Sequence, residues 1–121
     1  MSGYWNKILE VDLTSNETTI REPSEEFYRK YLGGAGFTTK IIYDELEPGT
    51  DPLGPDNILV VGPGNLLGPK IPTGSKTTFG FKAPETGGYG KAVVGAKMGD
   101  ALRKAGYDAL IVRGKAKSPK M

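Results

Sequence analysis

The sequence predicts an α+β fold, namely a β-rich layered domain of mixed sheets with a few short helices. Two uninterrupted apolar runs, "ILVV" and "ALIV", are flanked by turn residues, as buried strands are. Short segments with helical periodicity alternate with stretches rich in glycine and proline. Strands and helices mixed in this way indicate the α+β class, and 121 residues are the length of one domain, residues 1–121.

The N-terminal segment, residues 5–23, has the pattern of a β-hairpin. Ile8, Val11 and Leu13 precede the turn residues "TSNE", and "TTIRE" resumes strand-forming chemistry.

Residues 23–34 predict a short helix that begins after Ser24, a residue whose hydroxyl caps helix N-termini well. Acids follow the cap and basic residues precede the end, which suits the helix dipole. The expected inward side chains are Phe27, Tyr31 and Leu32, and a glycine pair stops the helix.

A second helix is expected over residues 36–49, with Ile41, Ile42 and Leu46 directed inward. The chain then turns and forms a buried strand over residues 57–62.

The C-terminal half continues with strands at residues 75–84 and 89–96, a helix over residues 97–107 and a final buried strand over 108–115. The apolar face of that helix is expected to contain Met98, Leu102 and Ala105.

Charge is divided along the chain. Residues 1–68 carry 5 basic and 11 acidic side chains, a net −6, whereas residues 69–121 carry 11 and 3, a net +8. Within the basic part, residues 71–99 contain seven glycines, four lysines and one acid, Glu85. Exposed main-chain amides and lysines together favour an anionic ligand. The alternative is that the lysines only protect strand edges.

Absent residue types limit the chemistry. Without cysteine or histidine the chain has no disulfide, no thiolate ligand and no Ser-His-Asp triad. The acids Asp44, Glu45 and Asp108 fall at predicted helix-surface, turn or cap positions, so no catalytic acid is expected. No segment is as long and apolar as a membrane span, and the N-terminus lacks a signal-peptide core, which predicts a cytoplasmic protein.

Known nucleotide motifs fit poorly. "GPGNLLG" (62–68) follows a buried strand, but its spacing is GxGxxxG and no helix follows, so a dinucleotide site is disfavoured. A P-loop is rejected, because Glu85 replaces its first glycine. Lysines interleaved with Phe79, Phe81 and Tyr89 leave nucleic-acid binding as a less favoured hypothesis.

One family shares a series of these motifs in the same order: "GYWNKILEVDLTSNE", "YLGGAGFTTKIIYDEL", "DPLGPDNILVVGPGNLLG", "PTGSK", "KAPETGGYG" and "LRKAGYDALIVRGKAKSP". Over essentially its whole length the chain resembles the N-terminal domain of the aldehyde ferredoxin oxidoreductases, tungsten enzymes with a bis-pyranopterin cofactor. The resemblance implies a base on which the two pterins lie, within an enzyme that oxidises an aldehyde and passes electrons to ferredoxin.

The resemblance also implies specific contacts. Cofactor-binding positions fall on Gly74, Lys76, Val93, Gly95 and Ala96. The backbone carbonyl of Val93 corresponds to a ligand of the magnesium ion that bridges the pterin phosphates. The cofactor would be tungsten or molybdenum bis-pyranopterin with magnesium.

Two departures from the family matter. The family typically has "PTGGR" where this chain has "PTGSK", so Lys76 keeps the charge but loses the planar fork of arginine. It often has an asparagine-containing segment where this chain has "KAVVGAKMG".

The family's domain is longer, and the cysteines that ligate its [4Fe–4S] cluster lie in later domains. We therefore expect an incomplete N-terminal domain, not a complete enzyme by itself, whose partners are the remaining domains or a separate subunit. Uncovered apolar surface would allow the isolated chain to self-associate as a homo-oligomer. The alternative is a stand-alone binding or interaction protein on the same fold without redox activity.

Overall fold

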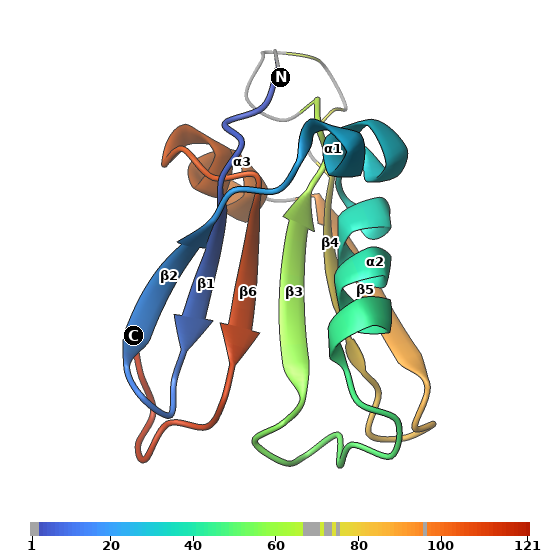
Figure 1. Ribbon diagram of the computed structural model, residues 1–121, viewed down its shortest axis with the longest axis vertical. Coiled ribbons are helices and arrows are strands. Elements are labelled where there is room, and N and C mark those ends of the chain that lie inside the picture. The colour runs from blue at the N-terminus through green and yellow to red at the C-terminus, as the bar shows by residue number, and fades with distance from the viewer. Residues whose placement is uncertain (1–2, 67–70, 72–73, 75, 96) are drawn as a thin grey trace.

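A computed structural model describes residues 3–66, 71, 74, 76–95 and 97–121. The described strands form one six-stranded sheet. Helices lie in front of it in the view of Figure 1. The elements are β1 (Ile8–Asp12), β2 (Glu17–Arg21), α1 (Glu25–Tyr31), α2 (Ala35–Glu45), β3 (Ile58–Pro63), β4 (Lys76–Lys82), β5 (Tyr89–Gly95), α3 (Lys97–Lys104) and β6 (Ala109–Arg113). The predicted α+β class and the order of elements are confirmed.

The strand order is β2-β1-β6-β3-β4-β5, and the sheet is mixed. β1 pairs with β6 in parallel, and every other neighbouring pair is antiparallel. The last strand of the chain therefore lies in the middle of the sheet, between the N-terminal hairpin β1–β2 and the meander β3–β4–β5.

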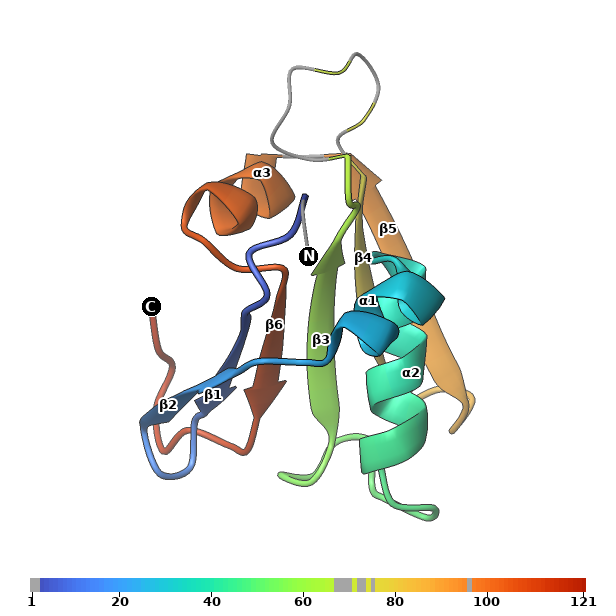
Figure 2. The same ribbon diagram turned by 45° about the horizontal axis from the view of Figure 1, so that its top comes forward.

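Helices α1 and α2 lie on the same face of the sheet, which we call the front face, and α3 lies at one end (Figures 1 and 2). The core fills the space between the front face and these helices. Its buried members are Ile8, Tyr28, Phe37, Ile41, Ile42, Ile58, Val60, Ala109 and Ile111. No helix in the described residues is both long enough and apolar enough to span a membrane.

Helix α2 packs very close to the sheet because two strand residues beneath it are glycines. A Cβ atom at Gly80 would lie 2.7 Å from Cβ of Thr38, and one at Gly62 would lie 2.6 Å from the carbonyl oxygen of Gly34. Real Cβ atoms do not approach other atoms so closely, so α2 can sit here only over glycine.

The cap of α1 and most inward residues of α1 and α2 were predicted correctly: Ile41 and Ile42 are in the core, and Phe27, Tyr31 and Leu46 pack against it. Ser24 caps α1, with its side chain accepting a hydrogen bond from the amide of Phe27. The predicted inward residue Leu32 is 56% exposed, whereas Tyr28 is fully buried. Leu32 ends the helix in a left-handed conformation (φ 61°), which turns its side chain away from the core.

On α3 the predicted apolar face is wrong for two of its three residues, whereas Leu102 is half-buried. Met98 is 45% exposed and Ala105 is exposed, whereas Gly99 and Arg103 are buried. The helix lies at one end of the sheet, where Gly99 and Arg103 face the protein and Met98 does not. Arg103 is buried there because a carboxylate binds it, a contact that helical periodicity cannot indicate.

Candidate functional site

The structure brings together four of the five predicted cofactor positions at one end of the β4–β5 pair. In the sheet register Lys76 lies directly opposite Gly95, and Thr78 lies opposite Val93. Gly74 lies two residues before Lys76. The fifth position, Ala96, lies outside the described residues. Residues far apart in sequence thus share one strand-end, which we call the β4–β5 end.

The main-chain amide and carbonyl of Val93 point away from β4, toward the edge of the described sheet. In antiparallel strands, residues that bond to the neighbouring strand alternate with residues whose amide and carbonyl point away from it. The amide of Ala83 donates to the carbonyl of Gly88 at 2.8 Å, which fixes this alternation. By the register, Gly88 and every second residue after it bond to β4, whereas Val93 and Gly95 direct their amides and carbonyls to the open edge.

This end of the sheet carries uncompensated positive charge. Lys76 and Lys97 at this end are exposed, as is Lys91 further along β5, opposite Gly80; among the described residues no carboxylate forms an ion pair with any of the three. Nor do the described acidic side chains gather anywhere in a group of three that could hold a metal ion. A cation here would need main-chain or ligand oxygens, which is the kind of contact expected for Val93.

Two helix N-termini adjoin the same end. α3 begins at Lys97, immediately after the end of β5 and the undescribed Ala96. α2 begins after Gly34 without a side-chain cap. The amide of Gly34 donates to the carbonyl of Pro63 at 3.0 Å, and the amide of Gly64 donates to the carbonyl of Lys76 at 2.9 Å. Helix N-termini favour anions, so this end suits phosphate.

Most glycines of residues 71–99 have structural roles instead of facing a ligand. Gly80 lies under α2, a Cβ at Gly90 would meet the ring of Phe81 at 2.5 Å, and residues 87–88 form the β4–β5 turn. Lys82 is also engaged, because its Nζ donates to the carbonyl of Thr50 at 2.6 Å. The stretch as a whole is therefore not one ligand-binding loop, and of its described residues Gly74, Lys76, Val93 and Gly95 lie at the candidate site.

The aromatic residues of the nucleic-acid hypothesis do not form one stacking surface. Tyr89 lies on the front face, where its hydroxyl is 2.9 Å from the hydroxyl of Thr38. Phe79 and Phe81 alternate with Gly80, which faces α2, so they lie on the opposite face. This placement removes the structural basis of the nucleic-acid hypothesis.

Sequence reasoning missed a buried polar cluster centred on Asp108, which was expected to be only a turn or cap residue. Its carboxylate is 1% exposed and accepts hydrogen bonds from the amides of Trp5 (3.1 Å) and Lys7 (3.2 Å), from the hydroxyl of Tyr28 (3.0 Å) and from Arg103. Burial and the negative charge of Asp108 raise the pKa of Tyr28. The cluster joins the N-terminal segment, α1, α3 and β6. Both carboxylate oxygens of Asp108 accept hydrogen bonds from other parts of the fold, so we assign the cluster a structural role.

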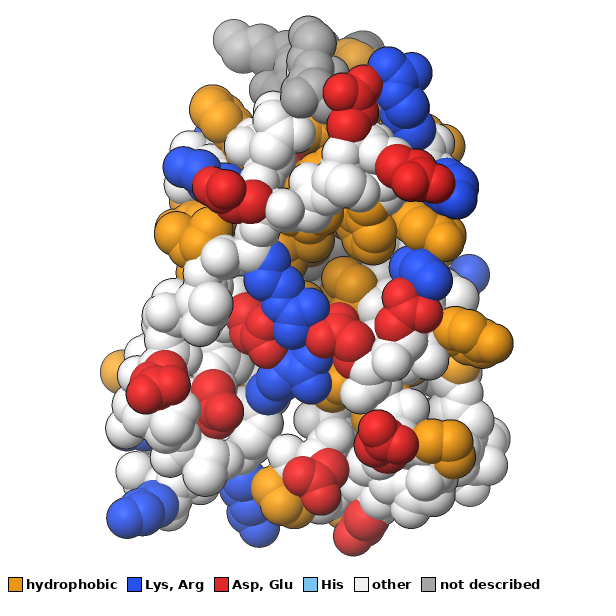
Figure 3. Space-filling model, viewed as in Figure 1, with side chains coloured by type: hydrophobic (Ala, Val, Ile, Leu, Met, Phe, Trp, Pro, Cys, Tyr) orange, Lys and Arg blue, Asp and Glu red, His pale blue; other side chains and the backbone are white. Residues whose placement is uncertain are grey.

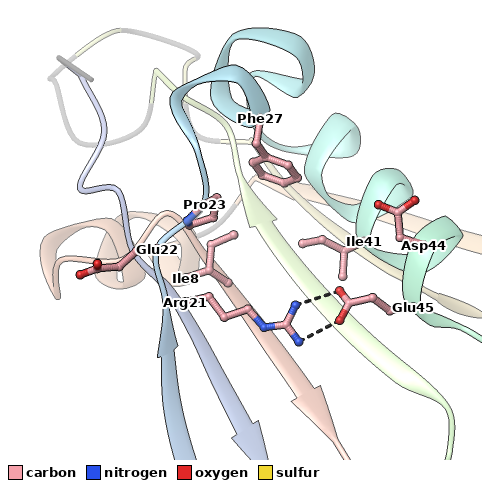
Figure 4. Close-up of a pocket in the computed structure, with 8 residues that line it drawn as sticks. All are labelled: Ile8, Arg21, Glu22, Pro23, Phe27, Ile41, Asp44 and Glu45. Carbon is pink, nitrogen blue, oxygen red and sulfur yellow. Dashed lines mark hydrogen bonds and ion pairs between the residues drawn. The ribbon is translucent and has the colours of Figure 1, made fainter.

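A cavity on the front face lies between the hairpin and the helices (Figure 4). Figure 3 shows a band of basic and acidic side chains crossing the middle of this face. Here Arg21 and Arg113 both pair with Glu10 and Glu45, with Arg21 Nη2 2.8 Å from Glu45 Oε1. Glu45 was expected to be exposed and is instead half-buried in this network. Because the carboxylates engage both guanidinium groups, the network ties α2 to β1, β2 and β6 and leaves little for a ligand.

We predict that the ion-pair network makes the stability of the fold sensitive to acid. Burial alone would raise the pKa of Glu10, but hydrogen bonds and charge from Arg21 and Arg113 outweigh it and hold the pKa below the ordinary 4.5. Such a carboxylate stabilises the fold fully above pH 4.5 and loses that contribution as the pH falls through the lower, folded-state value. Urea unfolding of Glu10→Gln should therefore show a smaller loss of stability between pH 6 and about pH 3 than the parent chain. Glu47→Gln, at an exposed position, is the control and should behave like the parent. Equal acid losses in Glu10→Gln and the parent would contradict the assignment.

Comparison with known proteins gives one consistent result. Residues 8–121 match the family model described as aldehyde ferredoxin oxidoreductase, N-terminal domain. The chain is 38% identical over 119 residues to a tungsten-containing aldehyde ferredoxin oxidoreductase of Thermococcus kodakarensis. It is 42% identical over 121 residues to the protein of that name from Pyrococcus abyssi. It is also 41% identical to the aliphatic sulfonate oxidoreductase, WOR-like subunit, of Pyrococcus furiosus.

Each alignment covers 98% of this chain, but the chain spans only about a fifth of each relative. A solved structure likewise contains a similar domain as a small part of a longer chain. The active-site complex BamBC of benzoyl coenzyme A reductase, in complex with 1,5-dienoyl-CoA, matches 96% of this chain with a TM-score of 0.91 and 30% identity. The match covers 18% of that chain.

Proposed function

Because the chain belongs to the aldehyde ferredoxin oxidoreductase N-terminal domain family, we propose that it forms the base on which the pterin cofactor of a larger tungsten oxidoreductase lies. The observation that carries the proposal is the arrangement of groups at the β4–β5 end. The main-chain carbonyl of Val93 points away from β4, Lys76 is exposed, and the N-termini of α2 and α3 lie nearby. None of these groups is a redox centre or an acid–base pair. They are suited to holding an anionic cofactor in place.

The residues present fit such a group. Lys76 would face a phosphate with its ammonium group, as a point charge without the bidentate geometry of arginine. Gly74 and Gly95 would let the cofactor approach the main chain, because glycine has no side chain. The carbonyl of Val93 would contribute to a magnesium ion, a hard cation that prefers oxygen ligands. The tungsten–pterin group, when bound, supplies the oxidation–reduction chemistry. Ala96 belongs to the same proposed set.

Relatives that are named for different substrates share this domain, which argues that the domain does not select the substrate. Proteins named for aldehydes, for aliphatic sulfonates and for benzoyl coenzyme A all contain a domain similar to this chain. A domain common to such different substrates is better suited to cofactor binding than to substrate recognition. For the assembled enzyme we propose aldehyde oxidation with electron transfer to ferredoxin. Its iron–sulfur cluster would be ligated outside this chain, which has no cysteine.

Charge reversal at Lys76 tests the proposal. In the complete enzyme that contains this chain, Lys76→Glu should lower tungsten or molybdenum per protomer several-fold, because it places a carboxylate beside the phosphates. Lys76→Arg should retain the metal. Elemental analysis of the purified protein measures the outcome.

Lys117→Glu, an exposed change of the same kind in the C-terminal tail, is the matched control. Unchanged metal content in Lys76→Glu would remove Lys76 from the site. Absence of tungsten and molybdenum from the parent enzyme purified from its native host would instead overturn the cofactor assignment itself and favour a binding role without redox activity.

A further inference from the structure

The two faces of the sheet differ sharply in charge. Strand side chains alternate between faces, and Gly62, Gly80 and Ile8 identify the front face because they lie against α2 or in the core. By the register, every charged strand residue lies on this front face: Glu10, Asp12, Glu17, Arg21, Lys76, Lys82, Lys91 and Arg113. The opposite face, which we call the back face, carries no charged strand side chain.

The back face is instead apolar from one edge of the sheet to the other. It consists of Leu9, Val11, Thr18, Ile20, Leu59, Val61, Pro63, Thr77, Phe79, Phe81, Gly90, Ala92, Val94, Leu110 and Val112. Only the part nearest α3 is covered, since Val61, Pro63 and Thr77 are buried. Leu59 in the middle of the sheet is 36% exposed, and Ile20 and Val94, on the two edge strands, are 49% and 40% exposed.

A solvent-facing sheet surface would be expected to carry polar side chains at these positions. The sequence does carry many charged strand residues, but all of them occupy the front face, against which α1 and α2 lie. A broad apolar patch of this kind marks a contact surface. A sheet that packs helices on one face and is apolar on the other is typical of a middle layer in a larger domain.

We propose that the back face is an interior surface, covered by an apolar layer formed by residues of the same enzyme that lie outside this chain. The lengths of the relatives favour a covering layer from the same enzyme. This chain aligns over nearly its full length with only about a fifth of each relative, which leaves many residues that could cover the face. The same fold, at a TM-score of 0.91, is embedded in a solved chain of which it makes up only 18%. The inference rests on the proposed function only in taking this chain as part of a larger enzyme, and it does not depend on tungsten.

The residues of the back face argue against two other partners, a separately soluble subunit and a membrane surface. An interface between separately soluble subunits keeps a polar rim, whereas this face is apolar up to Ile20 on one edge strand and Val94 on the other. Attachment to a membrane surface commonly combines apolar side chains with basic ones, and no basic strand residue faces this way.

The test is thiol accessibility in the complete enzyme. Leu59→Cys places a small thiol in the middle of the back face, and Tyr43→Cys places one at a position of α2 that is 83% exposed. Both variants are treated with a maleimide under native conditions, and labelling at each position is measured by peptide mass spectrometry. We expect residue 59 to be labelled at least tenfold more slowly than residue 43 in the complete enzyme, and the difference to be much smaller in the 121-residue chain, where both side chains are exposed.

Three results would overturn the proposal. Equal labelling at the two positions in the complete enzyme would mean that nothing covers the face. Protection of residue 59 that disappears on dilution, together with dissociation of a dimer in sedimentation, would identify a second copy as the occupant. Protection that requires phosphatidylcholine vesicles would identify a membrane. Loss of tungsten in a parallel metal assay would affect the proposed function without changing these rates.

A stability comparison gives a second, independent result. Leu59→Glu should strongly reduce the yield of folded complete enzyme, because it buries a charge in the proposed interface. Tyr43→Glu should not. A Leu59→Glu enzyme as stable as Tyr43→Glu would also overturn the proposal.

Discussion

Replacing Asp108 by alanine is expected to lower the free energy of unfolding by about 3–5 kcal/mol, the usual cost of breaking a buried ion pair. The loss would leave the guanidinium of Arg103, which is only 8% exposed, without its carboxylate. The amides of Trp5 and Lys7 and the hydroxyl of Tyr28 would lose their acceptor at the same time. Urea denaturation followed by circular dichroism measures the change.

Asp100→Ala is the matched control. Asp100 also pairs with a basic residue of α3, Lys104, but at (i, i+4) spacing on the helix surface. Exposed pairs of this kind contribute only about 0.3–0.5 kcal/mol. If Asp108→Ala costs no more than Asp100→Ala, the buried cluster does not hold the N-terminal segment, α1 and α3 together as described.

Phe37→Ala is expected to cost a comparable amount, about 3–5 kcal/mol, because it removes a large side chain from a closely packed core. Phe37 is 1% exposed, and its ring lies 4.9 Å from that of Phe27 and 5.5 Å from that of Tyr28, measured between centroids. The cavity left behind would lie between α1 and α2. The same urea titration gives the value.

Tyr43→Ala tests whether the effect is specific to the core. Tyr43 belongs to the same helix and has the same kind of ring, but it is 83% exposed. Its removal should change stability by less than about 0.5 kcal/mol. Similar losses for Phe37→Ala and Tyr43→Ala would indicate that α2 is destabilised as a helix and that core packing is not the cause.

Local signals in the sequence predicted the elements, because each depends on neighbouring residues. The turn "TSNE" joins β1 to β2 as expected, Ser24 caps α1, and the runs around Val60 and Ile111 are buried strands. Such caps, turns and apolar runs act over only a few residues.

Contacts between distant segments could not be read from these local patterns. Nothing near Asp108 in the sequence indicates that Trp5, Lys7 and Tyr28 will surround it, and helical periodicity placed Met98 inward where the fold buries Arg103. The charge-free back face is likewise hidden, because it depends on the register of six strands.

The candidate site was named through family resemblance, and its geometry came from the register. Lys76 and Gly95 are 19 residues apart, and only the β4–β5 pairing places them opposite each other. The sequence does not reveal that Val93 is one of the β5 residues whose amide and carbonyl point away from β4. That property follows from which residues of β4 bond to β3 and which to β5.

The central position of β6 has a consequence for how this domain is made. β6 is the only strand that joins the hairpin to the meander in the described sheet, and it comes last in the chain. During synthesis the two parts can form as separate units, but they share no ladder until residues 109–113 leave the ribosome. Pairing Ile8 with Ala109 closes a very long loop, so this step should limit the folding rate. Until then β1 and β3 each expose an unpaired strand edge that could pair with another chain.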